Sequence, residues 1–127
     1  MAERGAALRV LIADDNRDAM LTLGILVRSE GFVVKLTESG KQALAVAPYF
    51  EPDIVLLDIG MPELSGFDVA QELLQRYGAH CPVLIAVSGH RREEDLRRAK
   101  DCGFQHFVSK PYRPETLITL LNSVPSI

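Results

Sequence analysis

The sequence predicts an α/β protein built as a single (βα)5 unit, a doubly wound parallel sheet with helices on both faces. Five short aliphatic runs alternate along the chain with five amphipathic segments. The runs show little of the polar alternation found in sheets that have one exposed face. The length of 127 residues allows one compact domain of ordinary size and is too short for two.

The predicted strands are short and almost wholly aliphatic. They cover residues 8–13, 32–36, 54–57, 83–87 and 104–108. Strands that alternate with helices in this way favour parallel pairing through right-handed crossovers.

The first two predicted helices follow the first two strands. The first comes after A-D-D-N at 13–16, where Asp15 or Asn16 can cap it, and it ends at Gly31. The second is expected to begin after Ser39 and to stop near Pro48. One buried face of the first helix is predicted from the spacing of Met20, Leu23, Leu26 and Val27.

Three more helices complete the alternation. The third covers about 64–77, and the last starts near Pro114, a favoured first-turn position for proline. The fourth, R-R-E-E-D-L-R-R-A-K-D at 91–101, is highly charged and is closed by Gly103. It has two pairs at the i, i+4 spacing that supports an exposed helix: Glu93 with Arg97, and Glu94 with Arg98.

The composition excludes several classes of protein. A net charge of -3 and a pI near 5.6 argue against a domain whose main task is nucleic-acid binding, so we expect proteins or small ions as partners. No apolar run approaches the roughly 20 residues of a membrane span, and the start M-A-E-R-G-A-A does not resemble a signal peptide. We therefore expect a cytoplasmic protein, with Cys81 and Cys102 as ordinary thiols.

Chemically reactive residues follow four of the five predicted strands. Ligands of an open doubly wound sheet bind outside the carboxyl ends of its strands. The residues at these ends are Asp14 and Asp15 after the first strand, Asp58 after the third, Ser88 and Gly89 after the fourth, and Ser109, Lys110 and Pro111 after the fifth. Singly they could be a strand cap, a helix cap, a turn residue and a solvated lysine, but four such coincidences on one edge are improbable.

The expected cluster of three carboxylates needs opposing positive charge, because like charges raise one another's pKa. Lys110 supplies one charge, and a divalent cation would supply the rest. Oxygen ligands of this kind suit Mg²⁺. A carboxylate beside Mg²⁺ and a lysine suits phosphoryl transfer. One aspartate could then be a nucleophile that forms an aspartyl phosphate, and the other two would hold the metal.

The whole set of motifs resembles one known family. D-D at 14–15, D-I-G-M-P at 58–62, S-G at 88–89 and K-P at 110–111 match, in order and in element, the receiver domain of two-component response regulators. The resemblance covers about 8–122, so it implies one receiver domain over 1–127. It also implies a flavodoxin-like strand order of 2-1-3-4-5.

The resemblance implies a role for each acidic residue. Asp58 matches the phosphoacceptor. Asp14 and Asp15 match the acidic pair that binds Mg²⁺, or Mn²⁺ in its place, with Asp58 and the Gly60 carbonyl as further ligands.

It also implies roles for residues at the last two strands. Lys110 matches the lysine that pairs with a phosphoryl oxygen, and its bond to Pro111 is expected to be cis. Ser88 matches the serine or threonine that turns to hydrogen-bond the phosphoryl group. Phe107 matches the aromatic position that changes with it when the domain switches, and it lacks the hydroxyl of the commoner tyrosine. His90 lies where family members influence the lifetime of the phosphate, although an exposed loop histidine explains it equally well.

The expected function is therefore a phosphoacceptor of a phosphorelay. A histidine kinase or a histidine phosphotransfer protein would donate the phosphoryl group, and an output domain or downstream protein would meet the surface formed by the fourth helix, fifth strand and fifth helix. Candidate contacts on that surface are Arg91, Arg92, Arg97 and Arg98. A homodimer stays open as a further partner, whereas direct nucleic-acid or membrane contact is not expected.

Two other functions stay open at this point. One is a small Mg²⁺-dependent phosphatase or phosphotransferase with an aspartyl intermediate, although such enzymes usually carry an acid where Gly60 stands. The other is a receiver-like interaction module that is not phosphorylated, and the intact set of acids counts against it. The chain could be a free-standing receiver or a piece of a longer regulator or hybrid histidine kinase, and L-I-A-V-S-G-H at 84–90 with G-F-Q-H-F-V-S-K-P at 103–111 looks somewhat closer to the receivers of hybrid histidine kinases.

Overall fold

A parallel five-stranded sheet forms the centre of the computed structural model, which describes residues 7–89 and 93–124. The strand order is β2-β1-β3-β4-β5, so the order reverses between β1 and β3. This confirms the predicted fold class and the predicted strand order. The strands are β1 (Arg9–Ala13), β2 (Val33–Thr37), β3 (Ile54–Asp58), β4 (Val83–Ser88) and β5 (Phe104–Ser109).

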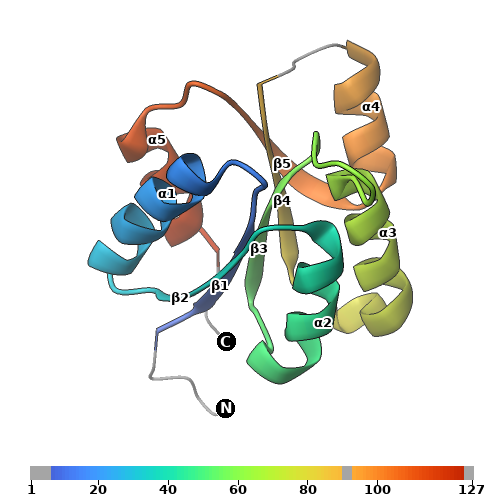
Figure 1. Cartoon of the computed structure of the whole chain (residues 1–127), viewed down its shortest axis with the longest axis horizontal. Coiled ribbons are helices and arrows are strands. Elements are labelled where there is room, and N and C mark those ends of the chain that lie inside the picture. The colour runs from blue at the N-terminus through green and yellow to red at the C-terminus, as the bar shows by residue number, and fades with distance from the viewer. Residues whose placement is uncertain (1–6, 90–92, 125–127) are drawn as a thin grey trace.

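Helices follow each strand and cover both faces of the sheet (Figure 1). They are α1 (Arg17–Ser29), α2 (Gly40–Phe50), α3 (Gly66–Tyr77), α4 (Glu93–Asp101) and α5 (Pro114–Asn122), with a short 3-10 helix at Gly78–His80. Within the described part of the chain, no helix is both long enough and apolar enough to cross a membrane.

Two hydrophobic clusters lie on the two faces of the sheet. Side chains of α2, α3 and α4 pack on one face, and side chains of α1 and α5 pack on the other. Successive residues of a strand point to opposite faces, so β3 supplies Val55 and Leu57 to the first cluster and Ile54 and Leu56 to the second. This double burial explains why the strands are uninterrupted aliphatic runs.

The second helix begins after Ser39, as predicted, and α2 then runs two residues past Pro48, to Phe50. A proline inside a helix lacks the N–H that would bond to the carbonyl four residues earlier, here that of Leu44. In the structure, Arg76 Nη1 of α3 donates to the Leu44 carbonyl oxygen at 3.0 Å. A side chain from another helix thus replaces the missing backbone donor, which sequence reasoning could not foresee.

Local capping fixes the starts of the helices that leave the site. Asn16, one of the two predicted caps, accepts a hydrogen bond from the Ala19 N–H at 3.1 Å. Helix α3 starts at Gly66, two residues later than predicted, because Ser65 and Asp68 form a reciprocal capping box.

Strand β5 contains an irregularity that controls where its side chains point. Leu84 pairs with Phe104 and Ile85 pairs with His106, so Gln105 is an extra residue between them. Because of this bulge, Phe104 and Phe107 both pack in the cluster under α2, α3 and α4, although residues three positions apart in a regular strand point to opposite faces.

Candidate functional site

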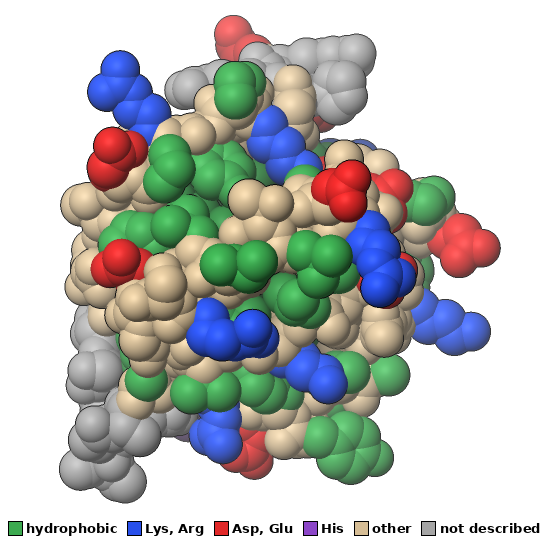
Figure 2. Space-filling view, turned by 60° about the vertical axis from the view of Figure 1, so that its left-hand side comes forward, with side chains coloured by type: hydrophobic (Ala, Val, Ile, Leu, Met, Phe, Trp, Pro, Cys, Tyr) green, Lys and Arg blue, Asp and Glu red, His purple; other side chains and the backbone are tan. Residues whose placement is uncertain are grey.

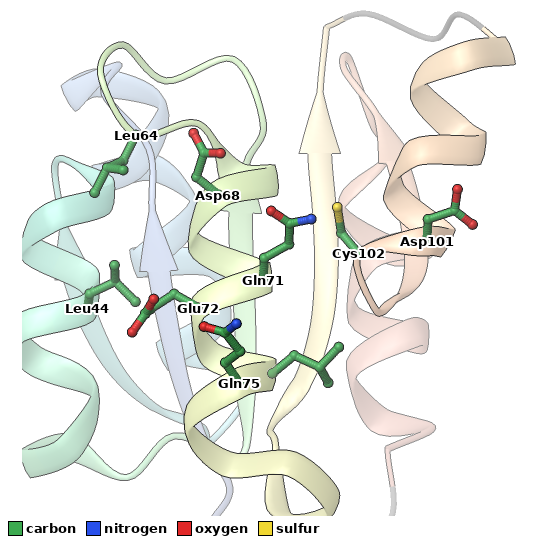
Figure 3. A pocket seen from close by; sticks show the side chains of 9 residues that line it. Leu44, Leu64, Asp68, Gln71, Glu72, Gln75, Asp101 and Cys102 are labelled. Atoms are coloured by element: carbon green, nitrogen blue, oxygen red, sulfur yellow. The ribbon is translucent and has the colours of Figure 1, made fainter.

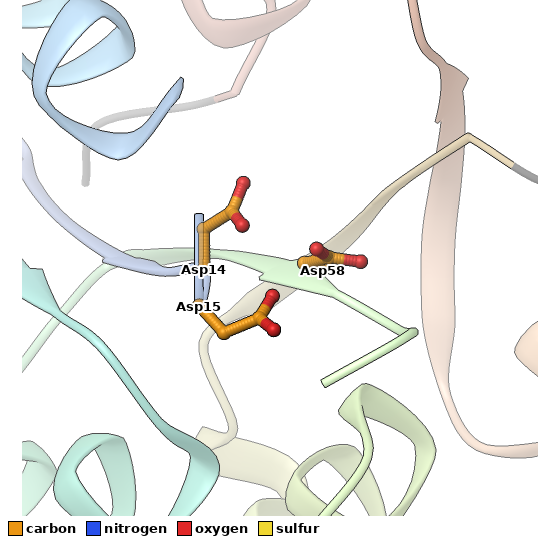
Figure 4. A group of neighbouring side chains, drawn as sticks. All are labelled: Asp14, Asp15 and Asp58. Carbon is orange, nitrogen blue, oxygen red and sulfur yellow. The ribbon is translucent and has the colours of Figure 1, made fainter. Parts of the chain in front are cut away.

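The three predicted aspartates converge at the carboxyl edge of the sheet. Asp14 and Asp15 follow β1, and Asp58 is the last residue of the adjacent strand β3. Each can offer a carboxylate oxygen so that all three oxygens lie within 4.8 Å of one another (Figure 4). Asp14 is buried, Asp58 is half-buried and Asp15 is exposed, so the cluster opens to solvent on the side of Asp15.

Lys110 is the positive charge of this cluster. Its Nζ lies 2.9 Å from Asp14 Oδ2 and 3.6 Å from Asp58 Oδ2. The side chains of Asp14 and Asp58 are only 6% and 14% exposed, so these contacts are poorly screened by water. Burial lowers the pKa of Lys110, but the hydrogen bond to Asp14 and the charge of Asp58 outweigh burial and raise it above its ordinary value. The lysine is therefore charged at neutral pH.

The electrostatic environment of Asp58 is unfavourable for its charge in the absence of a metal. Burial raises the pKa of its carboxyl, and the neighbouring charge of Asp14 raises it further. The hydrogen bond from the Gly60 N–H to Asp58 Oδ1, at 2.9 Å, and the charge of Lys110 act in the opposite direction but do not cancel the effect of burial.

The loops after β4 and β5 are joined at the same edge. Ser88 ends β4 and is buried, and its carbonyl accepts a hydrogen bond from the Lys110 N–H at 2.8 Å. The Lys110–Pro111 peptide bond is cis, as predicted. These contacts bring Ser88 and Lys110 together with the acidic cluster at one edge, as the sequence predicted.

The position of Phe107 differs from that of the other predicted site residues. It pairs with Ala86 in the β4–β5 ladder, two residues before the strand end, and it is half-buried against the cluster under α3 and α4. It also lines a surface pocket between α4 and β5, together with Leu96 and Gln105. The predicted positions His90, Arg91 and Arg92 lie outside the described residues.

One buried polar residue at this edge was missed. Thr37 ends β2, its Oγ1 donates to the Ile12 carbonyl at 2.9 Å, and its own carbonyl accepts from the Asp14 N–H at 3.2 Å. These two hydrogen bonds hold the end of β2 against the end of β1, which Asp14 and Asp15 follow. A polar residue at the end of an aliphatic run was the signal, but the run was predicted to end at Leu36, one residue too early.

The donor set fits a hard divalent cation. Three carboxylates lie close together beside one lysine, so the cluster holds more acidic groups than basic ones. Oxygen donors in such a set suit Mg²⁺, which also keeps several waters and therefore needs an open side. The exposed side of Asp15 provides that opening.

A large surface groove lies elsewhere, along α3. It has a volume of about 770 Å³, and its lining includes Leu44, Asp68, Glu72 and Cys102 (Figure 3). The carboxylates of Asp68 and Glu72 already contact Ser65 and Arg76, respectively. The residues that line this groove do not include Asp14, Asp15 or Asp58, so the groove and the acidic cluster are different sites.

Fold and site together define a class of protein. The family model of the response regulator receiver domain matches residues 10–122, and the chain belongs to this family, whose members act in two-component signalling. Among curated relatives, the protein PilH of Pseudomonas aeruginosa is 33% identical over 116 residues, which are 91% of this chain and 96% of PilH.

Other matches differ in how much of the related protein the chain covers. The cell cycle response regulator CtrA of Brucella ovis is 28% identical over 117 residues, 92% of this chain, and the chain spans 50% of its length. Among solved structures, chemotaxis protein CheY4 of Vibrio cholerae has a TM-score of 0.89 at 24% identity and shares the fold, with 94% of this chain and 100% of that chain covered. A signal receiver domain from Bermanella marisrubri has a TM-score of 0.84 at 26% identity, with 93% and 98% covered.

Proposed function

We propose that this chain is a phosphoacceptor that receives a phosphoryl group on Asp58 from a phosphohistidine of a partner protein. The observation that carries the proposal is the placement of Asp58 within one cluster with Asp14, Asp15 and Lys110, at the carboxyl edge of the sheet. Membership of the receiver family supports the same function.

The transfer moves one phosphoryl group between two side chains. An Asp58 carboxylate oxygen attacks the phosphorus of the phosphoimidazole, an O–P bond forms, and the N–P bond breaks. The imidazole leaves with the electron pair of that bond and takes up a proton. In the later hydrolysis, a water oxygen forms a bond to phosphorus and the bond between phosphorus and the Asp58 carboxylate oxygen breaks, which releases inorganic phosphate and restores the free carboxylate.

The residues around Asp58 have separate tasks in this proposal. Lys110 Nζ, now 3.6 Å from Asp58 Oδ2, would pair with a phosphoryl oxygen. Asp14, Asp15 and the Gly60 carbonyl, together with Asp58, would hold Mg²⁺. Bound there, the ion would supply positive charge that offsets the charge of the transferring oxygens.

The switch is proposed to run through the last two strands. Ser88 would hydrogen-bond the new phosphoryl group, and Phe107 would change its packing between β4 and the surface of β5. A partner or output domain would sense this change at the α4–β5–α5 surface, where Arg97 of α4 is exposed. Arg98, the neighbouring candidate contact, instead lies over the Phe67 ring of α3 at 4.3 Å. A ligand-induced shift between two states explains such signalling.

A protein donor also needs a docking surface near the site. Helix α1 starts directly after Asp14 and Asp15, and it exposes two apolar residues one turn apart, Leu21 at 40% and Ile25 at 67%. The side of the molecule with α1 and α5, turned forward in Figure 2, shows hydrophobic side chains interspersed with Lys and Arg. Such a mixed surface suits a histidine kinase or a phosphotransfer protein better than a small molecule.

The proposal is tested by incubating the chain with acetyl phosphate and Mg²⁺ and then measuring its intact mass. We expect one acid-labile phosphoryl adduct on the native chain. We expect none on Asp58→Asn, because an amide oxygen is a poor nucleophile. Chelation of Mg²⁺ should also suppress the adduct.

Asp53→Asn is the matched control. Asp53 is an aspartate at the opposite end of β3, where its Oδ2 accepts from the Arg9 N–H at 2.8 Å. This variant should still take up phosphate. An absent adduct on the native chain, or an undiminished one on Asp58→Asn, would overturn the proposal.

A further inference from the structure

We infer that Gly66 is a positioning residue for phosphoryl transfer, because the absence of its side chain lets the first turn of α3 rest directly on the backbone of Asp58 and Ile59. The inference rests on the proposed function of Asp58. Gly66 touches none of the reacting atoms and would act only through the loop that carries them.

The contact between Gly66 and the end of β3 leaves no room for a methyl group. A Cβ atom on Gly66 would lie 2.7 Å from Ile59 Cα, 2.9 Å from the Asp58 carbonyl oxygen and 3.0 Å from Ile59 Cγ2. Two of these three neighbours are backbone atoms, which cannot rotate away as a side chain can. The Gly66 N–H also donates to the Ile59 carbonyl at 3.4 Å.

Backbone conformation does not explain the glycine. The positive-φ glycines of the described chain are Gly31, Gly78 and Gly103, and Gly66 is not among them. An alanine could therefore adopt the same φ and ψ values, and space is what excludes it. This distinguishes Gly66 from the glycines that end helices.

Helix α3 is held too firmly to retreat from an added methyl group. The Asp68 N–H donates to Ser65 Oγ at 3.3 Å, and the Ser65 N–H donates back to Asp68 Oδ2 at 3.1 Å, so the helix start is locked. The next turns bury Phe67, Val69, Ala70 and Leu73 in the core. A methyl group at position 66 therefore displaces the segment that begins at Asp58.

That segment contains two groups of the proposed site. The Asp58 carboxyl group and the Gly60 N–H that bonds it at 2.9 Å both lie next to the displaced backbone. Phosphoryl transfer depends on alignment of the attacking oxygen, and a misplacement of about 1 Å can cost about 100-fold in rate. Gly66→Ala should therefore lower the rate of phosphoryl transfer in protein that is still folded.

The experiment compares the native chain with Gly66→Ala and Gly24→Ala. A Cβ atom on Gly24 would meet a Leu36 methyl carbon at 2.8 Å, so this control adds a contact of similar length between α1 and β2, away from Asp58 and against a side chain in place of backbone. For each protein we would measure the rate of adduct formation from acetyl phosphate at saturating Mg²⁺, the urea unfolding curve, and the amide NMR resonances of residues 58–60.

We expect Gly66→Ala to form the adduct about 10- to 100-fold more slowly than the native chain and to shift the resonances of residues 58–60. Gly24→Ala should lose stability but keep its rate within about twofold, with these resonances unmoved. Equal rates for Gly66→Ala and the native chain would overturn the inference, as would an equal slowing of both variants.

Two further outcomes are also decisive. If the native chain takes up no phosphate, the proposed function fails, and the resonances of residues 58–60 in Gly66→Ala alone decide whether the loop is displaced. If Gly66→Ala is poorly folded, the measurements are repeated in trimethylamine N-oxide, which favours the compact state. A variant that stays unfolded there would overturn the inference, because the whole fold and not the loop would have given way.

Discussion

Asp58 and Asp14 share one lysine unequally. Lys110 Nζ is 2.9 Å from Asp14 but 3.6 Å from Asp58, and Asp14 Oδ1 accepts a further hydrogen bond from the Asn16 N–H at 2.9 Å. Asp58 has the Gly60 N–H and the more distant lysine. The proposed nucleophile is thus the less compensated of the two, which agrees with the raised pKa of its carboxyl.

This imbalance predicts how stability depends on pH in metal-free protein. Burial raises the pKa of Asp58 above its ordinary value of 3.8 in the folded state. Its contribution to stability is therefore complete below the unfolded-state pKa and is lost as the pH rises through the folded-state pKa. Asp58→Asn should be more stable than the native chain at neutral pH, and this advantage should disappear on acidification.

Urea unfolding in EDTA across a pH series checks this prediction. Asp18→Asn is the control, because Asp18 is an exposed acid in the first turn of α1. Removing it weakens a favourable interaction with the helix dipole, so it should lower stability at neutral pH. A loss of stability in Asp58→Asn at neutral pH, like that of Asp18→Asn, would contradict the prediction.

Among the elements, α2 and α3 depend on each other through one hydrogen bond. Pro48 removes the backbone donor for the Leu44 carbonyl, and Arg76 Nη1 supplies a replacement at 3.0 Å. Arg76 also pairs with Glu72 at 3.0 Å within α3, which holds the guanidinium in position.

A double-mutant cycle measures this dependence. Arg76→Met should lower the free energy of unfolding by about 1 kcal/mol in the native background, where the Leu44 carbonyl loses its donor. It should cost clearly less in a Pro48→Ala background, because the Ala N–H can then bond that carbonyl within the helix. The lost pair with Glu72 is common to both backgrounds and cancels.

Chemical denaturation of the four proteins gives the coupling energy. The two helices are coupled as described if the cost of Arg76→Met differs between the backgrounds. Equal costs would mean that water satisfies the Leu44 carbonyl without help from α3.

At the scale of the whole molecule, the candidate metal site exists only when the sheet is assembled. Asp14 and Asp15 follow β1, Asp58 ends β3 and Lys110 follows β5, so residues far apart in the chain meet at one edge. An unfolded chain would not hold these groups together. Binding to the folded state alone stabilises it by mass action.

Mg²⁺ should therefore raise the midpoint of thermal unfolding. A concentration of 100 times the dissociation constant corresponds to about 2.7 kcal/mol of stabilisation. Differential scanning calorimetry with and without Mg²⁺ measures the shift, and NaCl at equal ionic strength is the control for screening. Asp15→Asn should reduce the shift, and an unchanged midpoint in the native chain would contradict a metal site at this edge.

Much of this architecture was predictable from the sequence, because it depends on local pattern. The aliphatic runs marked the strands, and Asn16 and the glycines marked helix ends. The rule that parallel strands share a carboxyl edge predicted that Asp14, Asp15, Asp58, Ser88 and Lys110 would come together. The sequence by itself therefore determined the order of elements, the fold class and the principal residues of the candidate site.

Only the tertiary structure decided features that depend on contacts between distant segments. Where α2 extends past Pro48, a guanidinium of α3 donates to the Leu44 carbonyl that the proline leaves without its backbone donor. The unequal sharing of Lys110 follows from distances of a few ångströms, and the need for glycine at position 66 follows from its closeness to the end of β3. Local patterns specify which residues face the core and which end a strand, whereas exact separations arise only when the helices pack on the sheet.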